Sequence, residues 1–225
     1  MSCQHVLSAE FLPSGQFTER VSAAIIHRMS GDKLVVAMCS GPYFDTAASA
    51  ISARLAIGTS IDYLNAAKIA VTRRWNSLTD DEQWDQGWAG TACGIVLTFT
   101  TDSCSAAWLG DNHAFHFRNS RIIDRAVPHS VFEELQNRGT KNADSALRHV
   151  LTKWLATEHL ADVRNWDLVD GDMILICSSY VDEELIRTWR PDRNSVHDLA
   201  RQAGSRSPRL SHTVVGIHIS NAEFQ

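Results

Sequence analysis

The sequence of 225 residues lacks the features of a membrane-spanning, exported or nucleic-acid-binding protein. It has no apolar run near the roughly 20 residues that span a bilayer. Residues 1–10 lack the basic region and apolar core of a signal peptide. The formal net charge of −5 argues against a general binder of phosphate backbones, which needs clustered lysine and arginine. We therefore expect a cytoplasmic protein that binds neither a membrane nor a nucleic acid.

A disulfide framework is also not expected, because the five cysteines are odd in number and scattered. Cys39 and Cys177 stand in apolar, strand-like runs, where a free cysteine usually packs as a small hydrophobic residue. A nucleophilic role would require an activating base and a lowered pKa, so we favour buried structural thiols. A chain of this length can bury a core without such staples, and we expect one domain over residues 1–225.

The apolar pattern predicts an α+β domain built on antiparallel sheets. Short apolar runs bounded by turn residues predict strands at 34–39, 93–100, 105–109, 114–118, 121–123, 173–177 and 214–219. Helical spacing predicts helices at 46–57, 60–75, 131–138, 146–156 and 182–189. We predict loops over the acidic segment 79–90 and over 203–210. This order lacks strict βαβ alternation and is typical of a layered α+β fold.

Four segments beside these elements carry glycine, aspartate and histidine in a set order. They are Gly-Thr-Ala at 90–92, Trp-Leu-Gly-Asp-Asn-His-Ala-Phe at 108–115, Pro-His-Ser at 128–130 and Leu-Val-Asp-Gly-Asp-Met-Ile-Leu-Ile-Cys-Ser at 168–178. In order and spacing they resemble the signature blocks of PPM (type 2C) metal-dependent serine/threonine phosphatases. Those blocks read Gly-Thr-Thr, Val-Gly-Asp-Ser-Arg-Ala-Tyr, Asp-His-Ser, and Pro-Gly-Asp followed by an apolar strand and Cys-Ser-Asp-Gly. The resemblance covers roughly residues 15–219.

The resemblance implies a four-layer α-β-β-α sandwich of two antiparallel sheets flanked by helix pairs. It also implies two Mn²⁺ or Mg²⁺ ions that share carboxylates and hold the water that attacks phosphorus. This sequence departs from that pattern at the metal ligands. The degenerate ligand positions are Arg20, Ser40, Gly41, Ser179 and Ser211. Only Asp111 is retained, at a position that serves a third, weaker metal in the family.

We therefore expect no cofactor, or at most a weakly held Mg²⁺ or Mn²⁺ ion. The leading hypothesis is a pseudophosphatase that keeps the fold as a protein-binding or regulatory module in phospho-signalling. One alternative is an active serine/threonine phosphatase with rearranged ligands drawn from Asp111, Asp45, Asp182 and His212. Another is a sensor that binds phosphorylated small molecules in the emptied cleft.

Other polar residues have simpler structural interpretations. His113 and His116 are three residues apart on a predicted strand, so we expect them on opposite faces, partly exposed, and not as a metal pair. Ser130 with Glu133 suits a helix N-cap and capping box better than a nucleophile. Arg206 is one of three arginines whose segments could converge on the cleft, although exposed, solvated arginines are the simpler expectation.

Overall fold

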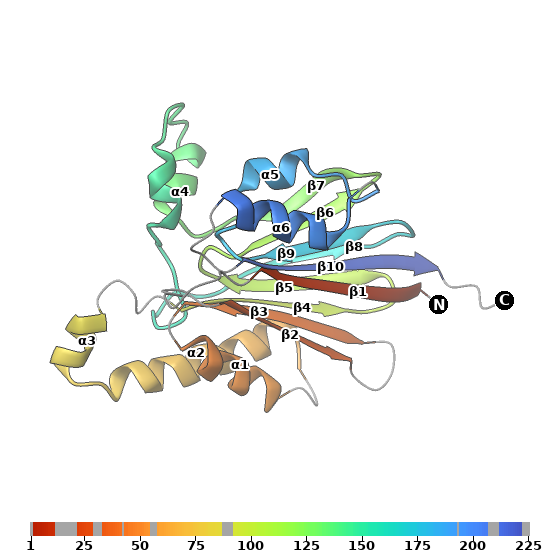
Figure 1. Ribbon diagram of the computed structural model, residues 1–225. Helices are drawn as coiled ribbons and strands as arrows, with labels where there is room; N and C mark the ends of the chain where they lie inside the picture. Colours follow the sequence, from red (N-terminus) through yellow and green to blue (C-terminus); the bar gives the residue numbers. More distant parts are fainter. Residues whose placement is uncertain are drawn as a thin grey trace.

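The computed structural model describes most of the chain. Its backbone is described over residues 2–11, 22–28, 33–41, 43–54, 58–86, 92–192, 194–206 and 212–221, and its side chains over 33–41, 43–54, 58–83, 92–192, 194–206 and 212–220. Two antiparallel sheets pack face to face, with helices on their outer faces (Figure 1). This arrangement confirms the α+β class and the α-β-β-α layering. Within the described residues, no helix is long and apolar enough to cross a bilayer.

Each sheet has five strands. The first has the order β1 (Ser2–Phe11), β10 (His212–Asn221), β9 (Met173–Cys177), β6 (His113–Arg118) and β7 (Arg121–Ala126). The second has the order β2 (Ser22–Arg28), β3 (Leu34–Ser40), β4 (Cys93–Phe99), β5 (Ser103–Leu109) and β8 (Asp162–Asp167). The chain passes directly from the second sheet to the first through the short turn between β5 and β6.

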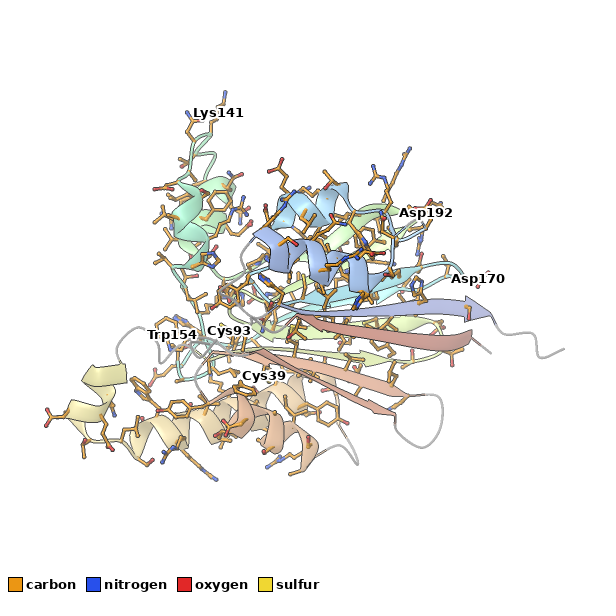
Figure 2. The ribbon with its side chains drawn as sticks, in the orientation of Figure 1. Cys39, Cys93, Lys141, Trp154, Asp170 and Asp192 are labelled. Atoms are coloured by element: carbon orange, nitrogen blue, oxygen red, sulfur yellow. The ribbon has the colours of Figure 1, made fainter. Side chains whose placement is uncertain are left out.

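The helices lie outside the two sheets. α1 (Phe44–Ser52) and α2 (Ser60–Asn76) pack on the second sheet, and α5 (Glu183–Thr188) and α6 (Val196–Arg206) pack on the first (Figure 1). α3 (Asp80–Gln86) continues beyond α2. Between β7 and β8, α4 (Val131–Asn137) and the 3₁₀ turn η2 (Ser145–His149) form an excursion at one end of the sandwich. Lys141 lies at its outer tip (Figure 2).

Strand β3 shows why the central strands of the sheets have apolar residues at successive positions. Val36 and Met38 point into the core between the sheets, whereas Val35 and Ala37 pack under α1 and α2. Both faces are therefore buried. Cys39 shares the helix-covered face, and burial raises the pKa of its thiol to about 12. Cys39 and Cys177 are both buried, as predicted.

Three predicted segments differ from the structure. The predicted loop at 79–90 contains α3, because Thr79 and Glu82 form a reciprocal capping box that sequence analysis overlooked. The predicted helix at 146–156 is the 3₁₀ turn η2 followed by irregular chain. Its backbone bonds elsewhere: Leu155 N donates to Ala92 O at 2.8 Å. The predicted loop at 203–210 begins inside α6, whose last residue is Arg206, and 207–210 lie outside the described residues.

Gly110 occupies the turn that joins the two sheets. Its φ is 106°, in the region that favours glycine. A Cβ atom there would lie 2.2 Å from Cys93 Sγ and 2.4 Å from Cys93 Cβ, closer than van der Waals contact allows. Gly139 provides a comparison: its φ is 86°, but a Cβ atom would meet nothing within 4 Å.

We predict that Gly110→Ala lowers the free energy of unfolding by about 2–4 kcal/mol, because backbone strain and overpacking add. Gly139→Ala should cost about 1 kcal/mol, since it adds strain alone. Urea unfolding of both variants measures the difference. An equal loss of unfolding free energy in the two variants would show that the Cys93 side chain moves aside at little cost and that the turn is not tightly packed.

Candidate functional site

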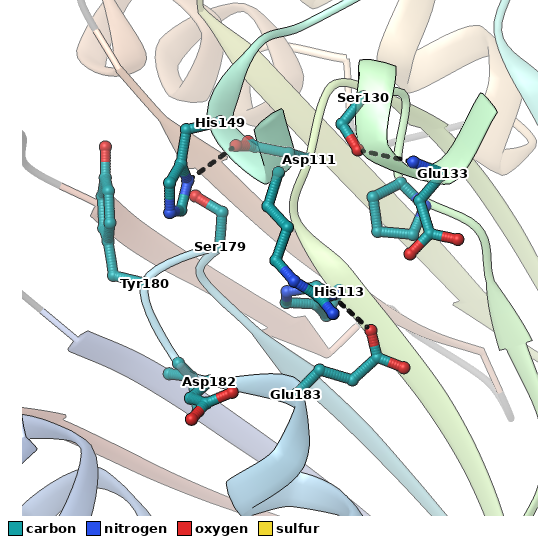
Figure 3. Close-up of a pocket in the computed structure, with 12 residues that line it drawn as sticks. Asp111, His113, Ser130, Glu133, His149, Ser179, Tyr180, Asp182 and Glu183 are labelled. Atoms are coloured by element: carbon teal, nitrogen blue, oxygen red, sulfur yellow. Dashed lines mark hydrogen bonds and ion pairs between the residues drawn. The ribbon is translucent and has the colours of Figure 1, made fainter. Parts of the chain in front are cut away.

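A pocket of about 260 Å³ lies where the β5–β6 turn, the α4–η2 excursion and the β9–α5 loop meet (Figure 3). The lining residues are Asp111, His113, Pro128, Ser130, Glu133, Arg148, His149, Ser179, Tyr180, Val181, Asp182 and Glu183. Three of the residues that sequence analysis considered as metal ligands or their replacements, Asp111, Ser179 and Asp182, therefore share this pocket.

The turn that carries Asp111 is held by Gly110 and His129. Gly110 N donates to His129 Nδ1 at 3.1 Å, and His129 N donates to Gly110 O at 2.9 Å. Because Nδ1 accepts, Nε2 carries the proton and faces Asp162 Oδ2 at 3.1 Å. Burial lowers the pKa of His129, which favours this neutral form. The imidazole ring also stacks on Trp108, with 6.0 Å between ring centroids.

Ser40 ties the end of β3 to the same turn. Its hydroxyl donates to Asn112 Oδ1 at 2.9 Å, and both residues are buried. Ser40 does not line the pocket, and the next residue, Gly41, turns the chain away with a φ of 82°. At a position where the sequence resemblance implies a metal ligand, this chain therefore has a hydroxyl that donates to Asn112.

Asp111 is 6% exposed and lines the pocket. Among the described residues, the basic side chain that faces its carboxylate is His149, with 3.8 Å between Asp111 Oδ2 and His149 Nδ1. This distance exceeds that of a hydrogen bond. The His149 ring stacks on Tyr180, with 5.8 Å between centroids, so these two rings form one side of the pocket (Figure 3).

The opposite side of the pocket is a network of arginines and glutamates. Glu183 accepts hydrogen bonds from Arg125 at 3.1 Å, from Arg148 at 3.2 Å and from Arg187. Arg125 also binds Glu133, with Nη2 2.8 Å from Oε2. Burial alone would raise the pKa of Glu183, but the arginines, Arg125 foremost, hold that pKa below its ordinary value.

His113 lies in the pocket wall and is buried. Desolvation lowers the pKa of its imidazole to about 4, although Glu183 and Asp111 oppose this shift. His116 points to the other face of β6, where its Nε2 donates to Asp172 at 2.8 Å. The prediction of opposite faces is confirmed. The prediction of partial exposure is wrong, because β6 is covered on both faces and both histidines are buried.

Asp182 is a capping residue. Its carboxylate accepts from Glu184 N at 3.0 Å as the N-cap of α5, and it pairs with Arg206 Nη1 at 3.0 Å. Arg206 therefore borders the pocket, paired rather than simply solvated. Ser130 likewise caps α4 by accepting from Glu133 N at 3.3 Å, which confirms the predicted N-cap. The predicted capping box is wrong, because Ser130 N donates to Pro128 O and the Glu133 carboxylate binds Arg125 instead.

The remaining predicted positions do not line the pocket. Asp45 is exposed in the first turn of α1. His212 is fully buried at the start of β10, and Gly41 follows β3 outside the pocket. Arg20 and Ser211 lie outside the described residues.

Sequence analysis missed several of the residues that shape the pocket: Arg125, Arg148, His149, Tyr180 and Glu183. One local signal was present, since Glu183 and Arg187 are spaced for an i,i+4 ion pair at the start of α5. The pairing of Glu183 with Arg125 joins residues 58 apart and leaves no local pattern.

The donor set does not fit the metal centre that the resemblance implied. Within the described residues, no three His, Cys, Asp or Glu side chains are grouped to hold a metal ion. By the sequence resemblance Asp111 keeps a carboxylate at a ligand position, whereas Ser40, at another such position, has a hydroxyl that donates to Asn112. Two hard divalent ions need several oxygen ligands, most of them charged.

We predict a pH-dependent contribution of His113 to stability. Its pKa is about 4 in the fold and about 6.5 in an unfolded chain, so the unfolded state binds more protons between these values. The free energy of unfolding therefore decreases as the pH falls through this window. Between pH 7 and pH 4 it should fall by about 3 kcal/mol more in the wild type than in His113→Asn. Urea unfolding at several pH values tests this, and parallel curves would contradict it.

Comparison of the sequence with models of known families and with curated proteins finds no match. Solved structures match nearly the whole chain. The S. agalactiae serine/threonine phosphatase aligns with a TM-score of 0.74 and 12% identity, over 96% of this chain and 99% of that one. The PPM phosphatase MsPP from Mycobacterium smegmatis, in complex with cacodylate, aligns at 0.67 and 20% identity, over 95% and 97%.

The catalytic domain of the phosphatase PstP, in complex with two manganese ions, aligns with a TM-score of 0.68 and 14% identity, over 98% of this chain and all of that one. Identities this low establish a shared architecture and not a shared activity. The two packed antiparallel sheets with helices outside each are common to all three comparisons. The chain therefore has the fold of the PPM-type serine/threonine phosphatases.

Proposed function

We propose that this chain is a pseudophosphatase: a cytoplasmic protein that keeps the PPM fold as a protein-binding or regulatory module in phospho-signalling. Ser40 is the main support for this proposal: the sequence resemblance aligns it with a metal ligand, and its buried hydroxyl donates to Asn112. Ser179 replaces a second ligand, and it lines the pocket with a neutral side chain.

The other carboxylates of the pocket are poor substitutes for the lost ligands. Glu133 and Glu183 are buried and bound to arginines, and Asp182 caps α5. Use of either glutamate as a metal ligand would take one of the two carboxylate partners from Arg125 and bring a metal ion close to that cation, which is unfavourable. This argues against the alternative of an active phosphatase with rearranged ligands.

The positions of the remaining candidate residues argue against both alternatives, the phosphatase with rearranged ligands and the small-molecule sensor. Asp45 and His212 do not line the pocket that contains Asp111. A sensor of phosphorylated small molecules would need available cations, but Arg148 is already bound to Glu183 at 3.2 Å. A phosphate would have to displace that carboxylate. A protein partner could contact the pocket and its rim without displacing Glu183 from Arg148 and without binding a metal.

We predict no turnover of para-nitrophenyl phosphate or of a phosphopeptide that depends on millimolar Mn²⁺ or Mg²⁺. The reason is that one retained carboxylate cannot assemble the dinuclear centre. The measurement compares product release with and without a chelator, and the PstP catalytic domain, assayed in parallel, is the positive control. Turnover that the chelator abolishes, and that Asp111→Asn also abolishes, would contradict the proposal.

A further inference from the structure

Asp111 differs from the other carboxylates that line the pocket. Each of the other three has an arginine within hydrogen-bonding distance: Glu133 with Arg125 at 2.8 Å, Glu183 with Arg148 at 3.2 Å, and Asp182 with Arg206 at 3.0 Å. Among the described residues, Asp111 has only His149 nearby, at 3.8 Å. Asp111 is therefore the one lining carboxylate whose charge is not matched by a bound arginine.

This side chain is also more than nine-tenths buried, with a relative exposure of 8%. Buried charged groups in native proteins are normally paired or fully hydrogen-bonded, because their desolvation is otherwise uncompensated. Asp111 lines the pocket, and its carboxylate lies beside His149 and Ser179 in the same space (Figure 3). The arrangement points to a cationic group that enters the pocket from outside the chain.

The basic residues that line the pocket do not supply the cation that would pair with Asp111. His113 is buried in the pocket wall, where its ring stacks on Phe115 with 5.7 Å between centroids. Arg148 is bound to Glu183, and its guanidinium lies 3.8 Å from the centre of the Phe132 ring. His149 is held at 3.8 Å from Asp111 by its stacking on Tyr180.

The chemistry around Asp111 selects among cations. A divalent ion needs several charged oxygen ligands, which this part of the pocket lacks. A primary ammonium carries one charge and three donors that can turn toward scattered acceptors. The Asp111 carboxylate and the Ser179 hydroxyl are acceptors of this kind. The rings of His149 and Tyr180 offer apolar faces for an alkyl stem.

We propose that the pocket binds a primary ammonium group beside Asp111, as carried by a lysine side chain of a protein partner or by a free alkylamine. The proposal rests on the proposed function as a binding module and names the chemistry that the module recognises. The organic cation takes a position at which the family resemblance implied a weakly held metal.

The test is an NMR titration of the ¹⁵N-labelled chain at pH 7.5 with three probes. They are Nα-acetyl-lysine methylamide, its Nε-acetylated form and n-butylamine. The lysine derivative should shift the amide signals of Asp111, Ser179 and Tyr180 saturably. The Nε-acetylated form, which has no charge, should not. Tighter binding of the lysine derivative than of n-butylamine supports a lysine side chain, and equal binding supports a free amine.

The matched variants are Asp111→Asn, which keeps the shape and removes the charge, and Glu158→Gln, an exposed acid outside the pocket. Asp111→Asn should weaken binding of the lysine derivative at least about tenfold, and Glu158→Gln should leave it unchanged. Binding of the Nε-acetylated form as tight as the charged form would overturn the proposal, and that comparison needs no variant. Unaltered binding by Asp111→Asn, or no shifts with either amine, would also overturn it.

These outcomes are separable from those of the proposed function. Absence of amine binding with no chelator-sensitive turnover would leave the binding module in place with a different ligand chemistry. Chelator-sensitive turnover would refute the pseudophosphatase whether or not an amine binds.

Discussion

The reciprocal hydrogen bonds between Gly110 and His129 are the contact on which the pocket depends. They join the turn between the two sheets to the segment that begins α4, and these segments form two of the pocket's walls. Gly110 can approach His129 because it has no side chain to collide with Cys93. The ring of His129 is in turn held by Trp108 and Asp162. The position of Asp111 follows from this packing, whatever the pocket binds.

Contacts inside another of the signature blocks are structural as well. Asp172, in the Gly-Asp block, is fully buried and accepts from His116 and Arg118 at 2.8 Å. Burial would raise its pKa, but the hydrogen bonds of Arg118 and its other donors lower it, so it stays charged. Asp172 therefore stabilises the fold through these hydrogen bonds, and this role requires no metal. In the pocket, arginines bind Glu133, Asp182 and Glu183 and balance charges there.

The sequence supported the fold through its ordered blocks and its buried strands, but it was weaker at the site. Strand β8 was missed because Trp166 is its only buried residue, so it has almost no apolar pattern. The pairing of Arg125 with Glu183 was missed because it joins residues far apart in the chain. Asp111 and Ser179 line one pocket that Ser40 does not reach, whereas the tertiary role of Asp182 as a paired helix cap could not be read from its spacing. Local patterns predict elements, and long-range ion pairs shape the pocket.

We propose above that this PPM fold lacks a dinuclear metal centre. The most direct measurement is equilibrium dialysis of the purified chain against Mn²⁺ at neutral pH, with elemental analysis of the bound metal. We expect no stoichiometric Mn²⁺ at micromolar free concentrations, because the resemblance aligns Ser40 and Ser179 with carboxylate ligands of the family. Two tightly bound ions per chain, lost on addition of a chelator, would contradict it.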